Sequence, residues 1–247
     1  MTRRICLLTL CAALLLVSCS TAREAEIQSR NVAEVFNSDP RNNACGGPDI
    51  DNIQAITELS TQILLCHVEK ISDVEFTQLG SFCFTYEMKI EKILMDVSGE
   101  LKENDIIPVS STKGIITGTQ FLEACAGSPQ AQKFGYTKRE YKENDIIIST
   151  AFGCIPIETG KSYLIYLVDS YDIGDKLDEY IEFGRMFLYE YTDGVLYEGM
   201  DYKKMKISYK QLEKQISADV KNRSGRRDEI GAMGYIRELE EQQRKAN

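Results

Sequence analysis

The segment FCFTYEMKIEKIL, residues 82–94, decides the fold class of this chain. Every second side chain in its first nine positions is aromatic or aliphatic: Phe82, Phe84, Tyr86, Met88 and Ile90. The side chains between and after them are Cys83, Thr85, Glu87, Lys89 and Glu91. Successive side chains of a strand point to opposite faces, so this period of two predicts a strand with one buried face and one wet face. Because such a strand needs partners, the sequence predicts a mainly β fold.

Other segments rich in β-branched and aromatic residues predict the partner strands. We expect strands at residues 61–70, 106–111, 114–121, 145–149, 161–168, 185–191 and 195–197. The last two are separated by Asp193-Gly194, a pair that two-residue hairpin turns prefer. Polar stretches at residues 72–80 and 123–138 predict loops.

Helical spacing is found on both sides of the β-rich region. Ile53, Ile56, Leu59 and Ile63 recur at helical spacing and predict a short helix that leads into the first strand. Near the C-terminus, Ser208 and Gln211 match a capping box. The apolar residues that follow recur every four positions: Leu212, Ile216 and Val220. They predict a helix that packs through this stripe, interrupted by residues 222–227 and followed by a charged helix over residues 228–245. We expect the last twenty or so residues to be available to a partner.

The order of strands and turns between Ile63 and Tyr197 resembles a known family. A strand ending in His67-Val68-Glu69 precedes the long strand that ends in Lys89-Ile90-Glu91-Lys92-Ile93-Leu94, and Leu101-Lys102-Glu103-Asn104-Asp105-Ile106-Ile107 follows. Ile157-Glu158-Thr159-Gly160-Lys161-Ser162-Tyr163-Leu164-Ile165-Tyr166-Leu167 and the hairpin at residues 184–197 come later. This order is similar to the netrin-like, tissue-inhibitor-of-metalloproteinases-like OB fold. The resemblance implies a closed or partly closed five-stranded barrel whose loops bind a partner.

The inhibitors in that family use a free N-terminal Cys to chelate the zinc of a protease. The matching residue here is either Cys19 or Cys45, and Cys45 is internal. The resemblance therefore implies the fold of these inhibitors and not their activity.

The N-terminal residues resemble the signal peptide of bacterial lipoproteins. Arg3 and Arg4 precede a thirteen-residue apolar run, Ile5 to Val17, and Leu16-Val17-Ser18-Cys19 follows the pattern of a lipobox. The resemblance implies that Cys19 receives a diacylglycerol and becomes the mature N-terminus. The alternative is an ordinary cleaved signal peptide with a chance Cys nearby. The apolar run is shorter than the roughly 20 residues that a membrane-spanning helix needs.

These features divide the chain into four parts. We expect a signal peptide at residues 1–18, a spacer at residues 19–52, an OB-like β-barrel domain at residues 53–200 and a helical tail at residues 201–247. Turn-forming residues 39–43 and 46–49 support the spacer, although part of it can pack on the domain instead.

The charge balance restricts the partners of the mature chain. The full sequence has a formal net charge of −9, and loss of Arg3 and Arg4 with the signal peptide lowers it to −11. An acidic chain is not expected to bind nucleic acid. It is also not expected to lie with its folded part on anionic lipid, so the acyl chains on Cys19 would provide the attachment. We expect a location on the cell membrane or outer membrane, outside the cytoplasm.

The cysteines suggest few metal or disulfide sites. Of eight Cys, two leave with the signal peptide and Cys19 carries lipid. The remaining five are an odd number: Cys45, Cys66, Cys83, Cys125 and Cys154. A Cys66–Cys83 bridge would join opposite faces of neighbouring strands, and a Cys125–Cys154 bridge fits better. His67 is the single His, so no zinc site with familiar Cys/His spacing is expected, and no other metal or cofactor is predicted.

Three features of the sequence suggest chemistry, and each has a simpler interpretation. The acidic run at residues 169–179 suggests calcium, yet it lacks EF-hand spacing and reads as a solvated loop. Cys66 and His67 are adjacent, but strand alternation places them on opposite faces and disfavours a catalytic dyad. Residues 101–107 and 141–147 share six residues at a spacing of 40, which favours two similar turns over a duplicated domain.

The sequence therefore predicts a lipid-anchored surface protein with a non-catalytic binding or scaffolding role at the cell envelope, and with an envelope protein as its partner. Two alternatives remain open at this stage. One is an envelope hydrolase with a carboxylate-based site, which would need convergent carboxylates of raised pKa in a deep pocket. The other is a divalent-ion-dependent module that uses residues 169–179.

Overall fold

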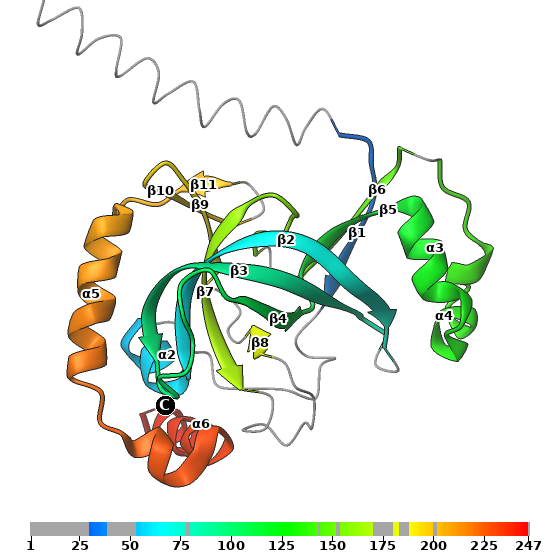
Figure 1. The fold of residues 1–247 in the computed structure, drawn as a ribbon. Helices are drawn as coiled ribbons and strands as arrows, with labels where there is room; N and C mark the ends of the chain where they lie inside the picture. The colour runs from blue at the N-terminus through cyan, green and yellow to red at the C-terminus, as the bar shows by residue number, and fades with distance from the viewer. Residues whose placement is uncertain are drawn as a thin grey trace, which may run out of the picture.

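The fold is known from a computed structural model, drawn in Figure 1. It describes residues 30–38, 53–77, 80–142, 144–151, 154–169, 180–182, 188–199 and 202–246. Strands predominate among these residues, so the prediction of a mainly β chain is confirmed.

An eight-stranded sheet forms the centre of the molecule. Its order is β11-β10-β9-β7-β2-β3-β4-β8, and all of its neighbouring strands are antiparallel except β4 and β8. The strands are β2 (Gln62–Phe76), β3 (Phe82–Asp96), β4 (Ile106–Ser111), β7 (Ser162–Asp169), β8 (Tyr180–Glu182), β9 (Leu188–Thr192), β10 (Val195–Glu198) and β11 (Lys203–Lys204). The short strand β8 has a second partner, because it also pairs antiparallel with β7.

Strand β3 has the faces that its sequence predicts. The five apolar side chains from Phe82 to Ile90 are at most 1% exposed, whereas the polar side chains between them are half-buried. Strand β2 is longer than predicted. It continues to Phe76 through residues 72–76, where we expected a loop, and most side chains of this outer arm are wet. The core-facing residues of the arm, Ile71, Val74 and Phe76, do not keep a period of two, because the pairing of β2 with β3 is irregular here, and the exposed residues between them are polar.

A second, three-stranded sheet lies beside the first. Strand β1 (Val32–Ser38) pairs parallel with β6 (Ile146–Ala151), which pairs antiparallel with β5 (Gly114–Thr117). Strand β1 belongs to the segment expected to be a spacer, so the alternative in which part of that segment packs on the domain applies to residues 32–38. Its partner in the sheet lies more than a hundred residues later in the chain, which no local pattern reveals.

Helices replace a predicted strand end and a predicted loop after β5. We expected a strand to Phe121 and a loop over residues 123–138. The chain instead forms α3 (Gly118–Ala126), α4 (Pro129–Lys133) and a short 3-10 helix, η1 (Tyr136–Lys138). Thr117 and Gln120 form a capping box at the start of α3, and this pair in the sequence is the signal that the strand prediction overlooked.

An aromatic cluster joins the small sheet and α3 to the main sheet. The ring of Phe121 is fully buried and lies 5.2 Å from Phe82 of β3 and 5.3 Å from Phe36 of β1. Tyr136 stands edge-on to Phe36 and to Phe76 at 5.4 Å. Such ring pairs add to the stabilisation from burial itself. The cluster therefore fixes where α3 and β1 sit on the main sheet.

The other face of the main sheet is covered by helices from both ends of the described chain. Helix α2 (Ile53–Leu59), as predicted, precedes the first core strand, and α5 (Tyr209–Lys221) begins at the predicted capping box of Ser208 and Gln211. Leu212 and Ile216 are fully buried in this layer, which confirms the predicted packing of α5. Burial of each contributes roughly 1.5–3 kcal/mol.

Helix α6 (Arg226–Ala246) follows after a short break and bends at Gly231, whose φ of 74° is not helical. Arg223, just before it, donates from Nη2 to the carbonyl oxygens of Glu58 (3.0 Å) and Ser60 (3.2 Å) at the end of α2. Tyr235 packs against the buried layer between α2, α5 and the sheet. One side of α6 is therefore attached to the fold, and the availability of the last twenty residues to a partner stays a prediction.

We predict that Phe121→Ala lowers the free energy of unfolding by about 3–5 kcal/mol, because it empties the centre of the aromatic cluster. Phe134→Ala is the matched control, since that ring is 49% exposed, and should cost less than half as much. Chemical denaturation measures both. Equal losses for the two variants would contradict the role given to the cluster.

Candidate functional site

The predicted lipidation residue, Cys19, and the signal peptide lie outside the described residues, which begin at Arg30. Arg30 is held to the folded part through an ion pair, with its Nη1 2.7 Å from Oε1 of Glu158. The chain therefore enters the structure next to the turn at Thr159 and Gly160 that precedes β7.

Most of the predicted cation-binding loop, residues 169–179, also lies outside the described residues. Of its residues only Asp169, the last residue of β7, belongs to a described element. Within the described ranges no group of three or more His, Cys, Asp or Glu side chains is arranged to hold a metal ion. The hypothesis that residues 169–179 bind calcium therefore stays a prediction.

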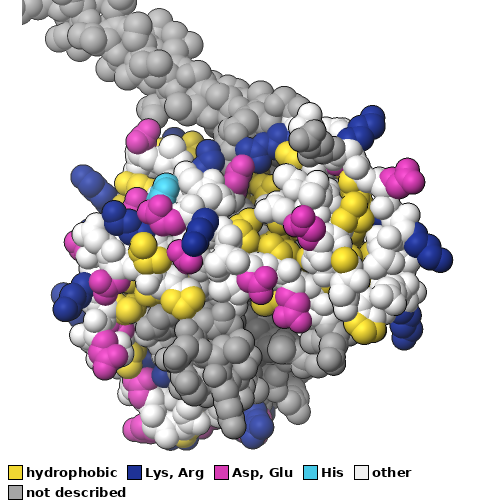
Figure 2. Space-filling model, turned by 45° about the vertical axis from the view of Figure 1, so that its right-hand side comes forward, with side chains coloured by type: hydrophobic (Ala, Val, Ile, Leu, Met, Phe, Trp, Pro, Cys, Tyr) yellow, Lys and Arg dark blue, Asp and Glu magenta, His cyan; other side chains and the backbone are white. Residues whose placement is uncertain are grey.

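The adjacent pair Cys66 and His67 does not form a dyad. Cys66 is fully buried in the core, whereas His67 is half-buried and points to the other face of β2. Burial, together with the nearby charge of Glu91, raises the pKa of the Cys66 thiol well above its usual range. The cyan side chain of this single histidine lies at the surface in Figure 2, beside acidic and basic side chains.

His67 instead joins a chain of three polar side chains on β2, β7 and β3. Its Nδ1 lies 3.2 Å from Oγ of Ser162, and the same hydroxyl donates to Oε1 of Glu91 at 3.2 Å. Because the hydroxyl gives its one proton to Glu91, His67 is the donor in its contact with Ser162. In this arrangement His67 does not act as a base toward Ser162. The two contacts link side chains of the three neighbouring strands β7, β2 and β3.

Neither of the two disulfides considered from the sequence is formed. Cys66 and Cys125, one member of each suggested pair, have free thiols. Cys125 is buried on α3, and this burial raises its pKa to about 11, although the charge of Arg139 acts in the opposite direction. The register of β2 and β3 explains the first case, since Cys66 faces Ile90 and Cys83 faces Glu75.

The two repeated heptapeptides fold into the same local turn. In the first, the carboxylate of Asp105 accepts from the backbone N–H of Lys102 (2.9 Å), and in the second Asp145 accepts from Lys142 (2.7 Å). Each turn leads directly into a strand, β4 or β6. The interpretation as similar turns therefore agrees with the structure.

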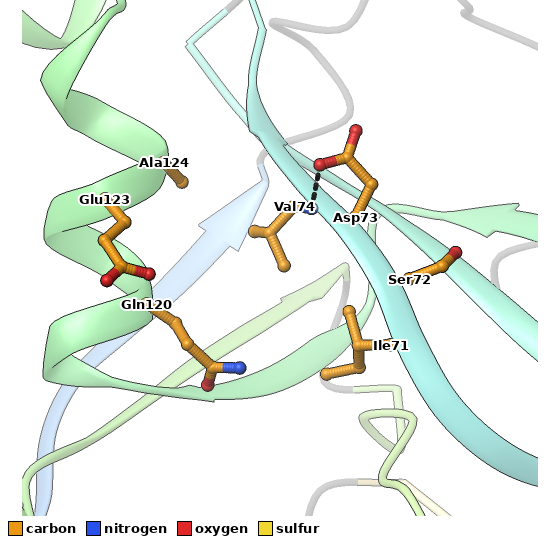
Figure 3. Close-up of a pocket in the computed structure, with 7 residues that line it drawn as sticks. All are labelled: Ile71, Ser72, Asp73, Val74, Gln120, Glu123 and Ala124. Carbon is orange, nitrogen blue, oxygen red and sulfur yellow. Dashed lines mark hydrogen bonds between the residues drawn. The ribbon is translucent and has the colours of Figure 1, made fainter.

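A groove lies between the outer arm of β2 and α3. It has a volume of about 350 Å³. Figure 3 shows the residues that line it: Ile71, Ser72, Asp73, Val74, Gln120, Glu123 and Ala124. In Figure 3, side chains from α3 and from β2 face each other across the groove. Figure 2, in which the right-hand side of Figure 1 is turned forward, shows hydrophobic side chains gathered on the surface.

Most polar groups of the groove already serve the local structure. Asp73 accepts from the backbone N–H of Val74 (2.9 Å), and Ser72 donates to the carbonyl of Thr85 (3.0 Å). The Gln120 carbonyl oxygen caps α3, which leaves its amide N–H groups and the exposed carboxylate of Glu123 for a ligand. The groove can hold a small group by hydrogen bonds, and its lining resembles a binding surface more than a reaction site.

A second hollow of about 310 Å³ lies between the end of β3 and the break between α5 and α6. Asp219 of α5 lies close by in the chain, and burial raises the pKa of its carboxyl group. Its titrating neighbour is the phenol of Tyr166, whose own pKa is raised by burial and then by the charges of Tyr189 and Asp219. This arrangement is one half-buried carboxyl group beside a phenol, so it differs from the paired carboxylates that the hydrolase hypothesis needs.

The comparisons with known proteins add no assignment. No protein-family model matches the chain, and no curated protein matches it. None of the described helices combines the length and the hydrophobicity that crossing a bilayer requires.

We predict that the Cys125 thiol of the folded chain reacts slowly with iodoacetamide. The thiolate is the reactive form, and raising the pKa from 9.0 to about 11 lowers its population at pH 8 by about a hundredfold. The rate should rise with pH toward 11, and unfolding in guanidinium should remove the protection. Peptide mass spectrometry measures both. Equal rates for the folded and unfolded chain at pH 8 would contradict the buried placement of this thiol.

Proposed function

We propose that this chain is an exported lipoprotein, held on a bacterial membrane by acyl chains on Cys19 and folded outside the cytoplasm. The observation that carries the proposal is the order Arg3-Arg4, apolar run, Leu16-Val17-Ser18-Cys19. A thiol at this position can accept a diacylglycerol, and two acyl chains give stable attachment where one gives marginal binding.

The place where the chain enters the fold supports a short attachment. Cys19 precedes Asn31, the residue before β1, by twelve positions. A fully extended chain of this length spans at most about 45 Å. The folded part would therefore stay close to the membrane surface, and its start at the small sheet, held by Arg30 and Glu158, would be the part nearest to the anchor.

We further propose that strands β2, β3, β4, β8 and β7 form an OB-like barrel in that order. Three antiparallel neighbours, a parallel β4–β8 pairing and an antiparallel β8–β7 pairing support this proposal. Closure of such a barrel depends on β8, which contributes two residues to one neighbour and three to the other. A barrel of this kind presents loops and grooves for binding.

The proposed role is binding or scaffolding at the cell envelope. The chemistry of the described surface supports a binder. The Ser162 hydroxyl donates to a carboxylate and accepts a hydrogen bond from His67, and the groove between β2 and α3 places hydrogen-bonding groups beside the side chains of Ile71 and Val74. The partner we expect is another protein of the envelope.

The anchor is tested with Cys19→Ala and, as the matched control in the same leader, Cys11→Ala. The parent chain and the control should incorporate labelled palmitate and lose residues 1–18, whereas Cys19→Ala should keep the leader and incorporate no label. Intact-mass measurement of the membrane fraction reads both outcomes. Incorporation of label into Cys19→Ala, or an unmodified mature N-terminus in the parent chain, would refute the proposal.

A further inference from the structure

The segment that contains β11 and α5 is strongly basic, although the chain as a whole is acidic. The whole sequence has a net charge of −9, yet residues 203–227 contain nine Lys and Arg and only two Asp and Glu. Six of the basic residues are exposed lysines, and we call them the lysine stripe: Lys203, Lys204, Lys206, Lys210, Lys214 and Lys221. The net charge of the whole chain does not reveal this basic surface.

Helix α5 places its lysines along one line. At about 100° per residue, Lys210, Lys214 and Lys221 fall within an arc of about 40°. The buried residues Leu212 and Ile216 fall on the opposite side of the helix, facing the main sheet. The packing of α5 therefore fixes the three lysines outward, and Lys203, Lys204 and Lys206 extend the line beyond the helix start.

The carboxylates of the described chain leave the lysines of the stripe without ion pairs, although Glu198 of β10 lies opposite Lys203 in the strand pairing. None of its six lysines forms an ion pair with another described residue. The arginines behind it differ, since Arg226 pairs with Glu229 and Glu238, and Arg223 pairs with Asp228. Glu213, the acidic residue nearest the centre of α5, is bound to Lys92 of β3 at 2.5 Å.

We propose that the lysine stripe binds the anionic headgroups of the membrane that carries the chain, an inference that rests on the proposed anchor at Cys19. Acyl attachment combined with a basic patch is a recognised route to stable membrane association. At 0.1 M salt, interactions between exposed charges more than about 10 Å apart are largely screened. The charge that a membrane meets at the stripe is therefore set by the local lysines and not by the distant acidic residues. This reverses the expectation, drawn from net charge, that the folded part stays off anionic lipid.

The arrangement of the fold is compatible with both attachments acting together. In Figure 1 the blue start of β1, β11 and the beginning of α5 all lie toward the upper end of the molecule. The start of the described chain and the near end of the stripe thus lie toward the same end of the molecule. Helix α5 runs downward from this end in Figure 1, so a membrane has to lie along the outer side of α5 to meet Lys221 as well as the lysines of β11.

Vesicle binding of a chain that starts at Ser20 tests the stripe separately from the anchor. This chain keeps every described residue and lacks both the apolar leader and Cys19. We expect it to sediment with vesicles made of a mixture of phosphatidylcholine and anionic phosphatidylglycerol, and not with vesicles of phosphatidylcholine alone. High salt should dissociate it from the mixed vesicles. Substituting Lys210, Lys214 and Lys221 together by Gln should weaken binding on the order of a hundredfold, at about fivefold per lysine.

The matched control substitutes Lys133, Lys138 and Lys142 by Gln, three exposed lysines around α4 and η1, and should leave binding within about threefold of the parent. Circular dichroism checks that both triple variants keep the fold. Equal weakening of both variants, or binding to heparin with none to the anionic vesicles, would overturn the proposal. Because no acyl chain is present, failure here leaves the Cys19 experiment to decide the anchor independently.

Discussion

The pairing of β2 with β7 at the centre of the main sheet is the constraint on which the rest of the structure depends. All six side chains from Tyr163 to Val168 are fully buried. Alternate residues belong to two different cores, with Tyr163, Ile165 and Leu167 on one face and Leu164, Tyr166 and Val168 on the other. A sheet buried on both faces needs a cover on each. The first face packs into the core that includes Ile155 and Ile157 and continues into the aromatic cluster, and α2 with α5 cover the second.

Because the second face of the sheet needs a cover, helix α5 is part of the folded core and not a free tail. A helix that buries Leu212, Ile216 and Tyr209 against the sheet is a layer of the fold, although its exposed side is highly charged. The hydrogen bonds from Arg223 to the end of α2 and from Ser224 to Glu58 then attach the start of α6 to the same layer. The lysines of α5 consequently stand on a rigid support, which is what a surface for a flat anionic partner requires.

The sequence predicted the elements whose signal is local and failed where the signal is distant. Phe82 to Ile90 alternates because one face meets the core, and Ser208 with Gln211 caps α5 by contacts within one turn, so both were predictable. Strand β1 exists because of β6, and the outer arm of β2 exists because of β3, so neither has a period of its own. Helix α3 was predictable in principle from Thr117 and Gln120. For the site, the opposite faces of Cys66 and His67 followed from alternation, whereas the contact of His67 with Ser162 needed the register of β7.

Native-state hydrogen exchange of the full chain tests most directly whether α5 is part of the core structure. If the second face of β7 needs α5, the amides of residues 212–216 and of residues 163–168 should exchange only through the same global opening, with the same free energy and the same dependence on denaturant. Rapid exchange throughout α5 while β7 stays protected would show that the sheet does not need this cover, and would remove the rigid support on which the lysines are placed.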